Sequence, residues 1–309
     1  MKKHILITGA TGMIGKELIK TLLTSGHNVS ILSRKPVKTK KIQVYLWDVY
    51  KQTIDQSCLD GIDTIVHLAG ENIAEKKWTK ERKQQIIDSR VLSTNLLYKT
   101  LKETPNQVKD FISASAVGYY GDCGDEILTE QSEKGYGFLA ECCAQWEAAV
   151  DKGKSLSLRT VKLRTGFILK KGEGGLASME KPIRFFVGAP LGTGKQWVPW
   201  IHIKDMINIY LFAIEHPVMI GAFNACAPYP VTNQTLTKSI AKSLHRPVWP
   251  IHVPESVLQS ILGEMSTVAL ISNNTSAQKL LDYGFTFNFT QLDDALNNIY
   301  HAQRYAAFQ

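Results

Sequence analysis

The sequence contains no run of about 18 apolar residues, the length that a helix needs to cross a bilayer. Its first residues, Met1-Lys2-Lys3-His4, lead directly into a short strand-like run, Ile5–Thr8. The longer apolar stretch and small-residue cleavage site of a signal peptide do not appear there. We therefore expect a cytoplasmic protein with no membrane partner.

Cysteine is scarce, and its pattern excludes two classes of site. The chain has five cysteines, Cys58, Cys123, Cys142, Cys143 and Cys226. They are odd in number and scattered, and no two of them form a C-x-x-C pair. This arrangement argues against a disulfide framework and against a zinc site. We expect no metal ion.

Negative charge is in deficit, because 36 lysines and arginines face 28 acidic residues and give a formal net charge of +8. Such a balance can indicate nucleic acid as a partner. Here the basic residues are spread along the chain, apart from one tight group at 34–41, and no aromatic-basic stripe accompanies them. We expect no nucleic-acid partner. A basic surface also suits an enzyme whose ligands carry phosphates.

Strand-like and helical patterns alternate through the first half of the chain. Apolar, β-branched runs typical of strands occupy 5–8, 28–33, 43–47, 64–68, 110–115 and 157–163. Helical periodicity occupies 14–25, 80–102 and 138–152. This β-α-β alternation predicts an α/β fold, a doubly wound, Rossmann-type parallel sheet with helices on both faces.

The pattern changes after about residue 165. The stretch Gly166–Gly194 contains seven glycines and two prolines, and we expect it to be rich in loops. A strand and then a helix are expected over 200–216, and another strand over 222–225. Helices are expected over 234–244, 255–262, 276–283 and 291–303. We predict a smaller α+β lobe over 166–309, on the substrate side, with a small helical domain from about residue 250.

The motif Gly9-Ala10-Thr11-Gly12-Met13-Ile14-Gly15 follows a buried strand and opens an amphipathic helix. A tight strand-to-helix turn needs the conformational freedom of Gly9. Gly12 allows the backbone to approach a pyrophosphate, and Gly15 allows close packing of helix on strand. The helix N-terminus offers free N–H groups and a partial positive charge. In this context the motif predicts a dinucleotide-binding turn formed by Gly9, Thr11, Gly12, Met13, Ile14 and Gly15.

The end of the second strand indicates which dinucleotide binds. Folds that prefer NAD carry an acidic residue there, which pairs with the ribose hydroxyls. This chain has Ser33-Arg34-Lys35 instead, and an arginine can pair with a 2′-phosphate. We therefore predict NADP as the cofactor, bound by a domain at 1–165 to which segments near 198–226 return. Asp48, at the end of the third strand, is placed to meet the adenine or to cap a turn.

The fourth strand ends in His67-Leu68-Ala69-Gly70 at the same edge of the sheet. The small residues there let the backbone pass beside a cofactor. We therefore add Leu68, Ala69 and Gly70 to the candidate binding residues, and expect His67 to be a packed, hydrogen-bonded core histidine.

These motifs together resemble the extended short-chain dehydrogenase/reductases. More narrowly, they resemble the atypical subgroup labelled "epimerase family protein", relatives of the nucleotide-sugar epimerases. The resemblance rests on GATGMIG at 9–15, SRKP at 33–36, HLAGENI at 67–73, SR at 89–90, SASAVGYYG at 113–121, FLAECCAQWE at 138–147, LRTGFIL at 163–169, APLGTGKQWVPWIHIKD at 189–205, LGEMSTVALIS at 262–272 and LLDYGFTF at 280–287. It implies NADP as the cofactor, with contacts from the Gly9–Gly15 turn, Ser33, Arg34, Leu68, Ala69 and Arg90. By itself, Arg90 is equally consistent with a solvated helix face.

The resemblance weakens at the catalytic residues. Members of the superfamily use a Tyr-x-x-x-Lys pair beside a serine or threonine, in which the lysine lowers the pKa of the tyrosine. Ser115 fits the serine position, but the residue four positions after Tyr136 is Ala140. Anchoring on Trp146-Glu147 instead puts Leu139 and Cys143 in the two positions. The pair is therefore absent.

Two readings of the chemistry follow. Tyr119 or Tyr120 can supply the phenol, although without a lysine well under about 1% of a phenol with a pKa near 10 is ionised at neutral pH. Alternatively, both tyrosines are structural and the chain has no turnover. We thus expect an NADP(H)-dependent oxidoreductase or epimerase that acts on a small carbonyl or nucleotide-sugar-like molecule. The alternative is a non-catalytic binder that reports the NADPH/NADP ratio.

Two charged residues of the second half have simple expected roles. Arg184 would suit a phosphorylated substrate but fits a solvated position better. Asp205, near the start of the helix expected after residue 200, is expected to be structural.

Overall fold

A computed structural model describes residues 2–37, 39 and 42–305, with side chains to residue 301. Lys38, Lys40 and Lys41 of the basic group lie outside the described residues. The chain forms two compact units. The first comprises Met1–Ala116, Glu141–Arg164 and Ile207–Phe223, and the second comprises Val117–Ala140, Thr165–Met206 and Asn224–Gln309. Residues 117–140 therefore group with the second half of the chain, unlike the expected division at residue 165.

The first unit is built on a mostly parallel, eight-stranded sheet with the order β12-β8-β6-β5-β1-β2-β3-β4. Its strands are β1 His4–Thr8, β2 Asn28–Ser33, β3 Gln43–Asp48, β4 Thr53–Ile54, β5 Thr64–His67, β6 Asp110–Ala116, β8 Arg159–Thr165 and β12 Gly221–Ala225. The central strand β1 pairs in parallel with β2 on one side and with β5 on the other. The short strand β4 runs antiparallel to β3.

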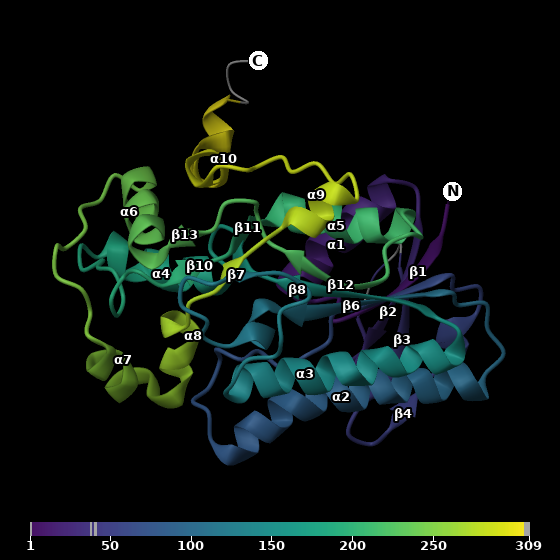
Figure 1. The fold of residues 1–309 in the computed structure, drawn as a ribbon. Helices are drawn as coiled ribbons and strands as arrows, with labels where there is room; N and C mark the ends of the chain where they lie inside the picture. Colours follow the sequence, from purple (N-terminus) through teal and green to yellow (C-terminus); the bar gives the residue numbers. More distant parts are fainter. Residues whose placement is uncertain (1, 38, 40–41, 306–309) are drawn as a thin grey trace. The chain divides into compact units, whose positions relative to one another are not determined.

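Helices cover both faces of this sheet (Figure 1). They are α1 Met13–Thr24, α2 Lys80–Glu103, α3 Phe138–Asp151 and α5 Ile203–Glu215. In Figure 1, α2 and α3 lie together on one face, and α1 and α5 lie on the other. The buried cluster on the α2–α3 side joins Leu6 and Phe111 of the sheet to Leu97 of α2 and Trp146 of α3. The doubly wound Rossmann-type fold expected from the sequence is confirmed.

Local sequence explains the central elements. Ile5, Leu6 and Ile7 are fully buried, as expected for a strand covered on both faces. In α1, Leu18 and Leu22 are one turn apart and fully buried, so the helix packs this stripe against the sheet. The strand expected from residue 157 begins only at Arg159, because Ser157 adopts a left-handed conformation with φ 57°.

The second unit is α+β and contains short strands. They are β7 Ile127–Leu128, β9 Phe167–Leu169, β10 Trp197–Val198, β11 Trp200–His202, β13 Val231–Thr232 and β14 Asn274–Thr275. They pair as β10-β13, β11-β9 and β14-β7. Its helices are α4 Gly174–Arg184, α6 Asn233–Ser243, α7 Glu255–Leu262, α8 Thr267–Leu270, α9 Gln278–Asp282 and α10 Leu292–Tyr305. The core includes Leu176, Trp200, Leu236 and Leu296.

Besides the loops expected for Gly166–Gly194, this stretch contains regular structure that its glycine content did not indicate. The segment contains β9 and the eleven-residue helix α4. Leu176 and Ile183 lie seven positions apart and are buried, which gives α4 an apolar stripe at helical spacing. The glycines lie mostly outside the helix, and Gly172 and Gly174 have φ values of +71° and +62° where the chain turns into it. The many glycines of this stretch mask the apolar spacing of the helix.

Candidate functional site

Two glycines of the turn between β1 and α1 are required by the geometry of the chain. Gly9 has φ +68°, and a Cβ atom there would lie 2.6 Å from the carbonyl carbon and oxygen of Leu68. A Cβ atom on Gly15 would lie 2.5 Å from the carbonyl oxygen of Gly9. Gly12 differs, because its Cβ would meet only that same oxygen at 3.2 Å and its φ is −74°. Packing within the chain therefore explains Gly9 and Gly15 better than it explains Gly12.

The N-terminus of α1 presents main-chain amides without side-chain competition. Gly12 is the N-cap, and within the described residues no side chain caps it and no acidic residue lies in the first turn. The Gly12 amide donates to the Gly9 carbonyl oxygen at 3.0 Å. The amides of Met13, Ile14 and Gly15 are those that a helix leaves without intrahelical partners. Beside the exposed Thr11, this arrangement is suited to an anion.

Thr8 and His67 fix the adjacent end of β5. Thr8 Oγ1 accepts the amides of Leu68 and Ala69, both at 3.1 Å. It also lies 2.8 Å from His67 Nδ1, and His67 Nε2 lies 3.1 Å from Ser93 Oγ in α2. Burial lowers the pKa of His67 to about 3, so the ring is neutral. The histidine is a hydrogen-bonded core residue, as expected, and it joins β1, β5 and α2.

The residues after β2 form a turn that exposes Arg34. Ser33 Oγ donates to the Lys35 carbonyl oxygen at 2.6 Å and accepts the Lys35 amide at 3.3 Å. The hydroxyl of Ser33 therefore holds the turn, and Arg34 projects from it with 72% of its side chain exposed. Arg34 Nη1 donates to Glu71 Oε1 at 3.2 Å. This contact is an exposed ion pair.

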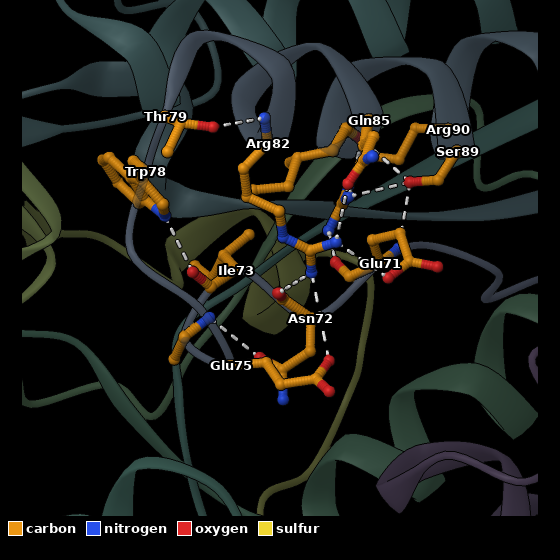
Figure 2. A network of polar contacts seen from close by, with 12 residues as sticks. Glu71, Asn72, Ile73, Glu75, Trp78, Thr79, Arg82, Gln85, Ser89 and Arg90 are labelled. Carbon is orange, nitrogen blue, oxygen red and sulfur yellow. Dashed lines mark hydrogen bonds and ion pairs between the residues drawn. The ribbon is translucent and has the colours of Figure 1, made fainter.

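Glu71 is the centre of a polar network, most of which is drawn in Figure 2. Its Oε2 atom accepts from Arg82 Nη1 at 3.1 Å. Its amide donates to Ser89 Oγ at 2.9 Å, and its carbonyl oxygen accepts from Arg90 Nη2 at 3.1 Å. Partial burial pushes the pKa of Glu71 upward, but the hydrogen bonds and charges of Arg82 and Arg34 outweigh burial, so the pKa lies below its usual value.

Arg90 is partly buried and hydrogen-bonded within the chain. Its guanidinium also donates to the Ile86 carbonyl oxygen at 2.8 Å and lies 5.1 Å from the ring of Trp146. A Cβ atom on Gly70 would lie 3.0 Å from the guanidinium carbon. The small residue that the sequence places at 70 therefore makes room for Arg90.

Asp48 caps a turn. Its Oδ1 atom accepts the amides of Tyr50 and Lys51, each at 3.0 Å. Of the two roles expected for Asp48, turn capping is the one that these hydrogen bonds describe.

Ser115, the candidate catalytic serine, is hydrogen-bonded to a buried ion pair. Its hydroxyl donates to Glu147 Oε1 at 2.7 Å. Arg164 grips the same carboxylate with two bonds, Nε to Oε1 at 2.8 Å and Nη2 to Oε2 at 2.9 Å, and Lys162 Nζ lies 3.5 Å from Oε2. Because the hydroxyl proton is directed at Glu147, Ser115 can offer a ligand its oxygen lone pairs.

The candidate tyrosines, which belong to the second unit, have different environments. Tyr120 is fully buried, and its hydroxyl donates to Asn224 Oδ1 at 2.6 Å. Asn224 is itself fixed, because its side-chain amide donates to the Ser276 carbonyl oxygen at 3.0 Å and its backbone N–H donates to Glu130 Oε1 at 2.7 Å. Tyr119 is partly exposed, and its ring packs edge-on against Tyr120 with centroids 5.5 Å apart. The phenol of Tyr120 therefore has a structural partner, and Tyr119 is the more accessible candidate.

Cys143, in one of the two positions where a lysine would stand, cannot serve as a base near neutral pH. It is buried, and desolvation raises the pKa of its thiol to about 12.

Two residues of the second half have structural partners. Arg184, half exposed, pairs with Glu180 one turn earlier in α4 at 3.2 Å. Asp205 accepts the amides of Asn288 and Phe289 at 2.8 and 2.9 Å, which agrees with its expected structural role.

Sequence reasoning missed Glu71, Glu147, Arg164 and Asn224. The sequence position of Glu71 could have indicated it, because Glu71 directly follows Gly70 at the edge of the sheet where the cofactor was expected. The other three lie inside elements, and their partners are fixed only by the fold. In the part of the chain that the structure describes, no group of three His, Cys, Asp or Glu side chains is arranged to hold a metal ion, and no helix is long and apolar enough to span a membrane.

Comparison with known protein families gives two matches. Residues 5–140 match the NAD dependent epimerase/dehydratase family, and residues 253–299 match a domain of unknown function. An epimerase family protein of Mycobacterium leprae is 33% identical over 298 residues, covering 96% of this chain and 95% of that protein. A chloroplastic epimerase family protein of Arabidopsis thaliana is 32% identical, covering 96% and 86%.

Solved structures of epimerase-type proteins are also similar to this chain. The human epimerase family protein SDR39U1, crystallised with NADPH, has a TM-score of 0.85 at 30% identity and covers 96% of this chain and 98% of its own. A nucleoside-diphosphate sugar epimerase of Corynebacterium glutamicum has a TM-score of 0.79 at 35% identity, covering 99% of this chain and 61% of that one. The Thermus thermophilus UDP-glucose 4-epimerase in complex with NAD shares the fold, with a TM-score of 0.75 at 16% identity.

Proposed function

Since the chain belongs to the epimerase family proteins of the NAD-dependent epimerase/dehydratase family, we propose that it is an NADP(H)-dependent oxidoreductase or epimerase. Its substrate is a small carbonyl compound or a nucleotide-sugar-like molecule. The observation that carries this proposal is the uncapped N-terminus of α1 at Gly12, in the same unit as an exposed Arg34 at the end of β2. The NADPH in the human relative, at 30% identity, supports the choice of cofactor.

The residues fit such a cofactor. Gly12 is exposed, and a side chain there would obstruct a pyrophosphate that approaches the amides of Met13 and Ile14. Arg34 has free space to pair with a 2′-phosphate. Leu68 and Ala69, fixed by Thr8, present backbone next to the turn. Bound nicotinamide would supply the hydride-transfer chemistry.

The chain's own residues define the rest of the chemistry. Ser115 accepts a hydrogen bond from a substrate hydroxyl, because its own proton is directed at Glu147. Tyr119 is the candidate phenol, since it is partly exposed whereas Tyr120 is fully buried.

A panel of carbonyl compounds and nucleotide sugars, incubated with NADPH, tests the enzyme. We expect oxidation of NADPH or epimerised product with at least one member. Tyr119→Phe should lower the rate by at least about 100-fold, the lower end of the contribution of general acid–base catalysis, and NADPH affinity should be retained. Gly12→Ala, which we expect to bind NADPH more weakly, serves as the matched control for dependence on the cofactor. Tight NADPH binding without turnover across the panel would contradict the enzymatic proposal.

One observation favours a second function. The hydroxyls of Ser115 and Tyr120 are both committed to buried protein partners, and the sequence lacks the Tyr-x-x-x-Lys pair. Both features suit a protein that binds NADP(H) without turnover and reports its redox state. Such a reporter must bind NADPH and NADP⁺ with different affinities, because a ligand shifts an equilibrium only by its differential affinity. Equal affinities in calorimetry would exclude this function.

A further inference from the structure

Glu71 joins two arginines that differ in their freedom to move. Arg34 reaches Oε1 at 3.2 Å and is 72% exposed. Arg82 reaches Oε2 at 3.1 Å, and its side chain is only 8% exposed. Arg82 also donates to the Asn72 carbonyl oxygen at 2.8 Å. The carboxylate thus connects a solvent-facing guanidinium that can turn away to a buried one that cannot.

The backbone of Glu71 is fixed as well. Its amide donates to Ser89, and its carbonyl oxygen accepts from Arg90. Both partners belong to α2, as does Arg82 (Figure 2). When Arg34 turns toward another anion, Glu71 therefore stays in place and keeps its ion pair with Arg82. Arg34 can thus exchange one anionic partner for another, and the buried Arg82 is not left without a partner.

We infer that Glu71 is a specificity-determining residue for the adenosine ribose, which competes with the 2′-phosphate of NADP(H) for Arg34 and so limits the preference for NADP(H) over NAD(H). This inference rests on the proposed function. To pair with Arg34, a 2′-phosphate must displace the Glu71 carboxylate from its 3.2 Å contact with Nη1, so the free energy of that ion pair is subtracted from the free energy of binding. A 2′-hydroxyl carries no charge and leaves the Arg34–Glu71 pair in place.

The expected size of the change in NADP(H) affinity follows from the exposure of the Arg34–Glu71 ion pair. Exposed ion pairs contribute little because water and salt screen them. Removing the charge of Glu71 should therefore tighten NADP(H) by roughly two- to fivefold, the equivalent of an exposed ion pair. The gain should shrink as ionic strength rises.

The test compares Glu71→Gln with the wild type by calorimetry, using NADPH, NADH and adenosine 2′,5′-bisphosphate. We expect tighter binding of NADPH and of the bisphosphate, and unchanged binding of NADH. The matched control is Glu75→Gln. Glu75 lies 3.9 Å from Arg82 and is 57% exposed, so the variant removes a carboxylate from the same cluster but leaves the Arg34 pair intact. It should leave the NADPH/NADH ratio unchanged.

A double-mutant cycle separates competition from general repulsion. In an Arg34→Met background, Glu71→Gln should give no gain for NADPH. If Glu71→Gln fails to fold because Arg82 loses its partner, the pair Glu71→Met/Arg82→Met removes both charges and should show the same gain. Weaker NADPH binding in the folded Glu71 variant, equal gains for NADH, or a gain that persists without Arg34 would each overturn the inference. A wild type that binds no nucleotide would instead refute the proposed function.

Discussion

Substituting the glycines of the β1–α1 turn one at a time should separate folding from binding. Alanine at Gly9 forces an L-residue into the left-handed region at φ +68°, which costs about 1–2 kcal/mol. It also drives Cβ into the Leu68 carbonyl group at 2.6 Å. That carbonyl can retreat only if the two hydrogen bonds from Leu68 and Ala69 to Thr8 are lost, at about 1 kcal/mol each. We expect Gly9→Ala to lower the free energy of unfolding by about 3–4 kcal/mol.

Alanine at Gly12 should behave in the opposite way. The backbone angles of −74° and 173° suit any residue, and the new methyl group meets one carbonyl oxygen at 3.2 Å. Alanine is a poorer N-cap than glycine, but it reduces the entropy of the unfolded chain. These effects offset one another to within about 1 kcal/mol. The methyl group stands where we propose that the pyrophosphate approaches, so NADPH affinity should fall at least about tenfold, or about 1.4 kcal/mol.

Urea unfolding followed by tryptophan fluorescence measures the first quantity, and titration with NADPH measures the second. Gly26→Ala is the matched control, because Gly26 has φ +81° but a Cβ there would meet nothing within 4 Å. It should show the conformational cost of about 1–2 kcal/mol without the steric cost. The reasoning is refuted if Gly12→Ala binds NADPH as the wild type does, or if Gly9→Ala is no less stable than Gly26→Ala.

Three further predictions follow. Arg34→Asp should weaken NADP(H) binding by about 1–3 kcal/mol and NAD(H) binding less, as measured by calorimetry; equal losses would show that Arg34 does not read the 2′-phosphate. Tyr120→Phe leaves the buried Asn224 oxygen without its 2.6 Å donor and should lower the free energy of unfolding by about 1–3 kcal/mol with NADPH affinity intact; unchanged stability would contradict the role given to Asn224. Burial lowers the pKa of His67 from 6.5 to about 3, so only the unfolded chain binds this proton between those values. The stability contribution of the neutral ring is complete above pH 6.5 and declines as the pH falls toward 3, by up to about 1.4 kcal/mol per pH unit. Between pH 6 and pH 4.5, the urea midpoint should therefore fall less steeply in His67→Gln than in the wild type. An unchanged dependence of the midpoint on pH would contradict this prediction.

The parts of the molecule that local pattern encodes could be predicted from the sequence. The turn Gly9–Gly15, the strand Asn28–Ser33 and the helix Lys80–Glu103 follow from apolar spacing and glycine position, and the structure has them within a residue or two of the expected limits. The role of His67 followed from its place in an apolar strand.

The remaining features depend on contacts distant in sequence. Arg34 and Glu71 are 37 positions apart, and Tyr120 and Asn224 are 104 apart. No local pattern encodes such a pairing, so Tyr120 looked as good a catalytic candidate as Tyr119. Helix α4 was missed for a different reason, because flanking glycines concealed a short apolar stripe.

The position of β12 has a consequence for the nascent chain. This strand supplies the neighbour of β8 at the margin of the large sheet, yet it is translated some 60 residues after β8 begins. Until Gly221–Ala225 leaves the ribosome, the edge of β8 that pairs with β12 presents unpaired main-chain groups, an arrangement that favours intermolecular strand pairing. Residues 1–165 contain the whole Gly9–Gly15 turn, but a chain that stops there would end in an unpaired edge strand, which favours aggregation.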